Sequence, residues 1–300
     1  MYDLVLLTDS RFTADYILDE YSENVILEDG LLMCALADKG LNVHKTHWND
    51  VHMDWSQTRT AIIRTTWDIY EDGNFSKFEQ WLENVKSQTQ LINEYSTVRW
   101  NLDKHYLIEL NEKGIQIPPT IFIEKGDTRS LNEVLTTSKW QNPILKPAIS
   151  GGGRHTYKLD NNDISEISPV YAQLIQEESM LLQEFQHNVV RKGELTLMVF
   201  GGKYSHAVLK KAKPGDFRVQ DDFGGTVHPY SPSPEEIAFA EKVVSVCDPT
   251  PLQARVDFIW DNNEALCVSE LELIEPELWF RNKSGSADQL AELIVKKYFG

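Results

Sequence analysis

The sequence predicts an α/β protein with a parallel sheet near its N-terminus and antiparallel hairpins near its C-terminus. The chain has 300 residues, 41% of them hydrophobic, which is enough for two or three compact units with large cores. Apolar strands alternate with a helical segment in the first hundred residues. Residues 255–272 have the pattern of a β-hairpin that carries several acidic side chains.

The N-terminal segment alternates strand and helix. Residues 2–7 predict a strand, residues 28–39 a helix, and residues 41–44 and 60–64 two further strands. Such alternation predicts a parallel sheet, and ligands bind these sheets beyond the carboxyl ends of the strands. Candidate substrate-binding residues are therefore those that follow or end two of the strands: Asp9, Ser10, Arg64, Thr66, Trp67 and Asp68. A core anchor is an equally good explanation for Trp67.

Charge and cysteine usage exclude several classes of protein. The net charge of −17 argues against nucleic-acid binding, because phosphate backbones need a basic surface. No apolar run approaches the roughly 20 residues that cross a bilayer, so we expect no membrane association and a cytoplasmic protein. Three widely spaced cysteines in apolar surroundings are expected to be reduced core thiols.

The predicted hairpin at residues 255–272 is the strongest sign of chemistry. A polar loop, Asp261 to Glu264, separates its two β-rich runs, and a turn centred in this loop sets Arg255 opposite Glu270. Side chains alternate along a strand, so one face holds Arg255, Asp257, Glu270 and Glu272. Close carboxylates repel each other by about 4 kcal/mol at an intermediate dielectric, and a divalent cation would cancel that repulsion. A solvated face with a salt bridge is the alternative.

A second motif is typical of a phosphate-binding flap. A short apolar strand ends at Lys146 and is followed by Ser150, Gly151, Gly152 and Gly153. Successive glycines let backbone N–H groups approach an anion closely. The pattern differs from a Walker loop because the lysine precedes the glycines. Glycines alone would fit a flexible turn equally well, but a lysine at the strand end favours a phosphate partner.

Two further segments follow in the order that a nucleotide site requires. Residues 180–185 predict a compact strand with a polar end, and Glu194 opens the next strand pair. A basic cluster between Lys210 and Arg218 comes next. A solvated loop is the alternative explanation for this cluster.

From about Asn101 to the C-terminus, the order of these pieces resembles the ATP-grasp superfamily of carboxylate-amine ligases. In that family a lysine-bearing strand and a glycine flap cover the phosphates of ATP, a hinge strand holds adenine, and acids on a late hairpin hold two Mg²⁺ ions. The resemblance implies that ATP is bound by Lys104, Lys146, Ser150, Gly151, Gly152, Gly153, Gln183, Glu184, Phe185 and Glu194. It implies metal ligands at Asp257, Glu270 and Glu272, and catalytic roles for Arg255, Lys210 and Arg218.

The resemblance also implies a division of the chain. Residues 1–95 would form a pre-ATP-grasp α/β domain and residues 96–300 a two-lobed ATP-grasp domain. The lobes would be a lid at about 115–185 and a metal-binding subdomain at about 186–300. Many relatives end the metal motif with Glu-x-Asn, whereas this chain has Glu270-Leu-Glu272. The extra acid would tighten the metal or change which phosphate oxygens it bridges.

Two segments narrow the resemblance to a branch of the glutathione synthetase and RimK-like ligases. The segments 270–276 and 64–70 resemble a branch that includes the ligase closing the ring in D-cycloserine biosynthesis. The implied reaction joins a small-molecule carboxylate to an amine through an acyl phosphate, with ATP and two Mg²⁺, or Mn²⁺, as cofactors. An ATP-dependent kinase of a small alcohol or sugar and a non-catalytic ATP-binding module are the alternatives. A homodimer is compatible with the family analogy.

Overall fold

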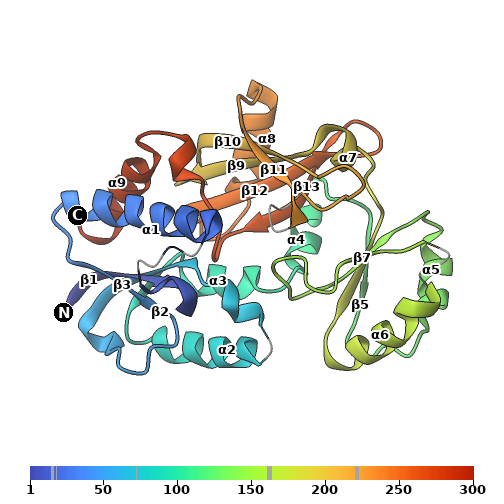
Figure 1. Ribbon diagram of the computed structural model, residues 1–300, viewed down its shortest axis with the longest axis horizontal. Coiled ribbons are helices and arrows are strands. Elements are labelled where there is room, and N and C mark those ends of the chain that lie inside the picture. The colour runs from blue at the N-terminus through green and yellow to red at the C-terminus, as the bar shows by residue number, and fades with distance from the viewer. Residues whose placement is uncertain (15–16, 18, 72, 161–163, 220–222) are drawn as a thin grey trace.

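The computed structural model describes residues 1–300 except 15–16, 18, 72, 161–163 and 220–222. It contains a parallel sheet and two antiparallel sheets, and Figure 1 shows them as three separate units with both chain ends at the same side of the molecule. Among the described residues, no helix is both long and apolar enough to span a bilayer. Cys247 and Cys267 are buried free thiols, but Cys34 is exposed on a helix surface, so the prediction of three core thiols was wrong for Cys34.

The N-terminal sheet is parallel, as predicted, with strand order β2-β1-β3-β4. Its two faces are covered by α1 and α2, which lie on opposite sides of the sheet in Figure 1. Both faces are therefore dry, which explains the unbroken apolar run in β1. Its elements are β1 (Tyr2–Thr8), α1 (Glu20–Asp38), β2 (Val43–His47), β3 (Thr58–Thr65), α2 (Asn74–Val85) and β4 (Gln90–Ile92), with short 3-10 turns η1 (Ser10–Phe12), η2 (Trp55–Gln57) and η3 (Trp67–Tyr70).

Helix α1 begins eight residues earlier than the sequence pattern predicts. Asp19 accepts a hydrogen bond from the Ser22 N–H, and the Ser22 hydroxyl accepts one from the Asp19 N–H. This reciprocal cap satisfies N–H groups that the first turn otherwise leaves open. The cap signal lies in a polar stretch, where apolar spacing gives no indication of a helix.

Residues 93–112 connect the N-terminal sheet to the other two. They contain the short helices α3 (Tyr95–Asn101) and α4 (Tyr106–Glu112). The Asn93 amide donates to the Gln253 and Leu273 carbonyls at 2.7 and 2.8 Å, and its oxygen accepts from the Leu252 N–H at 2.6 Å. One buried side chain thus fastens the N-terminal sheet to the C-terminal sheet.

The second sheet is a small antiparallel unit, at the right of Figure 1, with order β5-β8-β6-β7. Its strands are β5 (Thr120–Ile123), β6 (Ile144–Pro147), β7 (Tyr157–Lys158) and β8 (Met180–Gln183), and its helices are α5 (Leu131–Ser138) and α6 (Ile164–Glu177). Leu145, Leu182 and Tyr171 lie in the core that these helices share with the sheet. The other face of the sheet is left for the site.

The third sheet is antiparallel, with order β11-β10-β9-β12-β13. Gly193, directly before the first strand of this sheet, has a φ of +92°. A Cβ at this position would lie 2.4 Å from the Lys210 carbonyl oxygen, so the close approach of the two chains requires glycine. Its elements are α7 (Asn188–Lys192), β9 (Glu194–Phe200), β10 (Lys203–Lys211), β11 (Thr226–Tyr230), α8 (Pro234–Ser245), β12 (Gln253–Trp260), β13 (Leu266–Glu272), the turn η5 (Phe280–Asn282) and α9 (Ser286–Tyr298).

The β12–β13 hairpin exists, but its predicted register was wrong. Arg255 pairs with Glu272, not with Glu270, and Asp257 pairs with Glu270. The loop spans five residues, because Asp261 Oδ1 accepts hydrogen bonds from two N–H groups within it at 2.8 Å. A β-bulge opposite the Asp257–Phe258 step then shifts β13 by one residue. With the longer loop alone, Glu270 and Glu272 would lie on the face opposite to Arg255 and Asp257. The bulge shifts β13 by one residue and so brings all four charged side chains to one face.

Candidate active site

A cavity of about 740 Å³ lies where the three sheets meet. Its wall includes Lys146 from the small sheet, Glu270 from the C-terminal sheet and Trp67 from the N-terminal domain. All of the predicted ATP-binding and catalytic residues line this one space: Lys104, Lys146, Ser150, Gly151, Gly152, Gly153, Gln183, Glu184, Phe185, Glu194, Lys210, Arg218 and Arg255.

Two lysines converge on the acid side of the cavity. Lys104 Nζ lies 3.2 Å from Glu270 Oε1 and donates to the Ser150 carbonyl at 2.6 Å. The loss of solvent around Lys146 lowers its pKa, an effect that the nearby charge of Glu270 opposes. Lys104 therefore joins the glycine flap to the acidic strand, and Lys146 lies on the same side of the cavity as Glu270.

The glycine flap fits closely against two aromatic rings. A Cβ on Gly151 would lie 2.5 Å from Cδ2 of Tyr70, and a Cβ on Gly153 would lie 3.0 Å from Cε2 of Phe223. The Arg218 guanidinium stands 3.9 Å from the centre of the Phe223 ring and is held by Asp216 at 2.9 Å. Residues from the N-terminal domain and from the loop after β10 thus cover the flap, and only glycine allows this approach.

Three carboxylates converge on one face of the β12–β13 hairpin. Asp257, Glu270 and Glu272 each offer an oxygen, and these oxygens lie within 4.8 Å of one another. Carboxylate oxygens are the ligands that hard cations such as Mg²⁺ prefer. The donor set therefore fits the predicted metal site in ligand type and convergence.

Basic side chains balance these acids. Arg255 contacts both Asp257 and Glu272, and Lys210 Nζ lies 2.9 Å from Asp257 and 2.6 Å from Glu194. Burial alone would raise the pKa of Asp257, but Arg255 and Lys210 more than offset it and hold that pKa at about 2. Burial raises the pKa of Glu272 well above its usual range, against the opposing charge of Arg255.

Ser269 is a site residue that the sequence patterns did not indicate. It is skipped in the pairing between β12 and β13, lines the cavity and donates to Glu194 Oε2 at 2.7 Å. Glu194 is thereby held between Ser269 and Lys210. Its predicted contact with a ribose stays a prediction. A register argument that included the bulge would have found Ser269.

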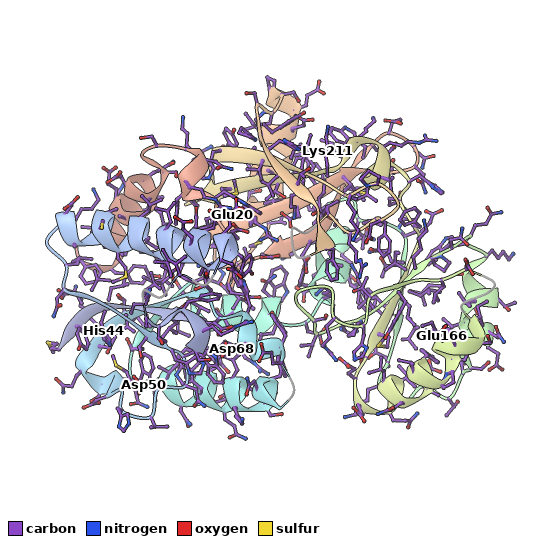
Figure 2. All side chains as sticks on the ribbon, in the orientation of Figure 1. Glu20, His44, Asp50, Asp68, Glu166 and Lys211 are labelled. Atoms are coloured by element: carbon purple, nitrogen blue, oxygen red, sulfur yellow. The ribbon has the colours of Figure 1, made fainter. Side chains whose placement is uncertain are left out.

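Among the predicted substrate residues, the structure places only Trp67 in the cavity wall. Asp9 is fully buried and bonds to Arg11, and Ser10 is exposed in the turn η1. Asp68 accepts hydrogen bonds from the Trp48 indole at 3.0 Å and from His47 at 2.7 Å. Figure 2 shows Asp68 among the side chains of the N-terminal domain, where it ties β2 to η3.

Arg64 and Thr66 also lie outside the cavity wall, and Arg64 is completely buried. Its Nη1 donates to the Pro276 carbonyl at 2.8 Å. The turn after β3 reaches the cavity wall at Trp67, but the Arg64 side chain near the end of that strand holds protein backbone in place. The cavity wall on this side is instead formed by residues without a predicted role: Arg11, Tyr21, Tyr70, Glu71, Glu275 and Glu277.

Comparison with known proteins gives consistent matches. A family model for the N-terminal domain of the D-cycloserine synthetase DcsG matches residues 4–93. The cycloserine biosynthesis protein DcsG of Streptomyces lavendulae is 26% identical over 284 residues, which cover 89% of this chain and 92% of that protein.

Solved structures match the whole chain. A crystal structure of D-cycloserine synthetase DcsG has a TM-score of 0.85 at 24% identity, covering 98% of this chain and 99% of that one. A RimK-domain ATP-grasp protein from Sphaerobacter thermophilus DSM 20745 has a TM-score of 0.67 at 17% identity, covering 99% and 100%.

Proposed function

This chain has the ATP-grasp fold and is related over most of its length to a synthetase of that fold, and from this premise we propose that it is an ATP-dependent carboxylate-amine ligase. The superfamily resemblance and the α/β fold class predicted from the sequence are thereby confirmed. One observation carries the proposal: Lys104, Lys146 and the acids Glu270 and Glu272 line the same cavity. The lysines can bind phosphate oxygens and the carboxylates can bind the metal ion, so this wall suits a metal-bound triphosphate.

Different residues around the cavity are proposed to bind the phosphates, the adenine and the metal ion. Lys104 and Lys146 neutralise phosphate oxygens, and the flap at residues 150–153 brings backbone N–H groups to them. Gln183, the last residue of β8, and the following Glu184 and Phe185 hold the adenine. Mg²⁺ bound by Asp257, Glu270 and Glu272 would neutralise charge on the phosphoryl group that is transferred.

The proposed chemistry proceeds in two steps. A carboxylate oxygen of the substrate attacks the γ-phosphorus, forming a C–O–P linkage while the bond to the leaving ADP oxygen breaks. An amine then attacks the acyl carbon, the C–O bond to phosphate breaks, and the amine loses a proton. Arg255, which is 9% exposed and lines the cavity, would stabilise the oxyanion that forms when the amine attacks the acyl carbon.

Trapping the acyl phosphate tests this proposal. The protein is incubated with ATP, Mg²⁺, hydroxylamine and a panel of D- and L-amino acids and hydroxy acids, and hydroxamates and ADP are measured. We expect hydroxamates that depend on both ATP and Mg²⁺. Binding of ATP without hydroxamate from any carboxylate would contradict the proposal, and a stable phosphoester would indicate a kinase instead.

A further inference from the structure

We propose that His105 is a positioning residue for the nucleotide, and that its protonated ring holds the small antiparallel sheet against the start of helix α4. The inference deepens the proposed function and rests on it, because it concerns how the two units around the cavity stay together. His105 has no predicted role, and its side chain lies outside the cavity wall. It would therefore act through neighbouring residues and not by touching ATP.

The small sheet is joined covalently to the C-terminal sheet at one end only. The chain crosses between the two units at residues 116–119 and 184–187, and both crossings lie at the same end of the β5–β8 pair. At the other end of this pair, Ile123 lies opposite Met180. Noncovalent contacts must hold the small sheet in place there, because the cavity is lined by both units.

His105 makes such a contact from the side of the C-terminal sheet. It directly precedes α4, whose Tyr106 and Leu107 are buried in the core of that sheet. His105 Nε2 lies 3.1 Å from Oε1 of Glu124, the residue after β5. The His105 ring also packs on Phe122 of β5, with the ring centres 4.5 Å apart. One side chain thus links the two units at the end that lacks a covalent crossing.

The link is complete only when the ring is charged. The second ring nitrogen, Nδ1, lies 2.5 Å from Asp103 Oδ1, so the ring stands between the carboxylates of Asp103 and Glu124. A neutral imidazole donates one hydrogen bond, whereas the protonated ring donates to both acids. Lys104 Nζ instead lies 3.2 Å from Glu270. Burial alone would lower the pKa of His105, but Asp103 and Glu124 more than offset it and raise that pKa above its usual value.

The residue before His105 carries the effect to the proposed nucleotide site. The Lys104 N–H donates to the Ala148 carbonyl at 2.9 Å, and Lys104 Nζ donates to the Ser150 carbonyl at 2.6 Å. Ala148 and Ser150 lie between Lys146 and the glycines of the flap. Movement of the small sheet away from His105 would therefore separate Lys104 from Lys146 and the flap, which are proposed to bind the same phosphates.

Protonation of His105 should therefore strengthen nucleotide binding. Its contribution is fully present below the ordinary histidine pKa of about 6.5 and is lost as pH rises through the raised pKa. The Glu124 side chain is mostly exposed, so solvent weakens this ion pair. We expect a contribution of about 4-fold in affinity, the order found for a partly exposed ion pair.

Binding of a non-hydrolysable ATP analogue with Mg²⁺ tests the inference. Its dissociation constant is measured at about pH 6 and about pH 9 for the full chain and for His105→Gln, which stays uncharged. Every other titrating group, including the nucleotide, is common to both proteins, so the ratio of the two constants isolates His105. We expect the variant to bind about 4-fold more weakly at the lower pH and equally well at the higher pH. A ratio that is the same at both pH values overturns the inference.

Two further variants assign the effect to the contact across the units. Glu124→Gln removes the carboxylate on the small sheet, so it should weaken binding at about pH 6 and lower the pKa of His105 in an NMR titration of its ring. His52→Gln changes an exposed histidine of the N-terminal unit and is the matched control, with unchanged affinity at both pH values. In the unchanged chain, the ATP analogue should raise the pKa of His105, because the two binding events are linked. A pKa of His105 that responds to neither Glu124→Gln nor the nucleotide overturns the inference.

Turnover separates this inference from the proposed function. A pH-dependent ratio of dissociation constants without any hydroxamate would support the role of His105 and contradict the ligase. Hydroxamate formation together with a pH-independent ratio would support the ligase and overturn the role of His105. Absence of nucleotide binding under all conditions would overturn both.

Discussion

The two sides of the cavity use charge differently. On the C-terminal sheet, Asp257, Glu270 and Glu272 face the site, and each lies close to Lys104, Lys210 or Arg255. On the N-terminal side, Arg64 and Asp29 are both fully buried and point into the protein. Arg64 keeps two donor nitrogens, and Asp29 one oxygen, without a hydrogen-bond partner among the described residues.

The charged side chains on the β12–β13 face can change partners, whereas Arg64 holds a segment of the backbone in place. Arg255, Glu270 and Glu272 on the β12–β13 face line the cavity, so they can change partners when a metal or phosphate binds there. Arg64 has no such exchange available, since its hydrogen bond to Pro276 holds the segment that carries Glu275. Substitutions on the first side should therefore change activity, and substitutions on the second side should change stability.

Glu270→Gln should have the largest effect. Loss of this carboxylate removes a proposed metal ligand and the partner of Lys104, so ATP-dependent product formation should fall about 1000-fold, while thermal stability changes little. Glu264→Gln, in the loop of the same hairpin, is the matched control and should keep full activity. If Glu270→Gln kept its turnover, Glu270 would not be a metal ligand that the reaction needs.

Arg64→Met should instead lower stability. The change leaves the Pro276 carbonyl without its donor and removes the Arg64 charge beside Asp29, so the free energy of unfolding should fall by about 3 kcal/mol in denaturant titration. Nucleotide affinity should change much less. Arg59→Met, an exposed position on the same strand, should cost at most about 0.5 kcal/mol. An equal loss of unfolding free energy in both variants would contradict the structural role of Arg64.

Asp29 should make stability depend on pH. Burial raises its pKa from 3.8 to about 6, with Arg64 and Lys45 opposing the shift. Between about pH 4 and pH 6 the folded state holds a proton that the unfolded state has lost, so this group's contribution to stability decreases as pH rises, by up to about 3 kcal/mol. Above pH 6 the contribution stays constant. Asp29→Asn should flatten the curve of unfolding free energy in this window, and an unchanged slope would contradict the pKa.

Gly151→Ala should give the smallest effect. The new methyl group meets the Tyr70 ring at 2.5 Å, so either the flap or the ring must move, and nucleotide affinity should fall about 10-fold. Removing the ring in the double variant Gly151→Ala with Tyr70→Ala should recover most of that affinity in a nucleotide titration. No recovery would show that the flap is limited by something other than this contact.

The sequence was most informative where chemistry and spacing coincide. Lysines, glycines and acids in a fixed order predicted the nucleotide side, and the structure places nearly all of them around one cavity. The substrate side was predicted from position alone, as residues following strands. That argument located the strand end but not the direction of its side chains. Arg64 and Asp68 were therefore nominated, although Asp68 bonds to Trp48 inside the N-terminal unit and Arg64 bonds to the Pro276 carbonyl.

The sequence by itself determined the fold class and the acidic hairpin, because apolar periodicity and charge type are local properties of the chain. The domain boundaries and individual site roles stay predictions. Tertiary structure decided the register of β12 and β13, through a five-residue loop and a bulge that local pattern does not encode. It also decided that Glu275 faces the cavity, since three side chains about 200 residues away in the chain hold that segment in place. Contacts across such separations depend on packing of the whole fold, which alternation along one strand cannot reveal.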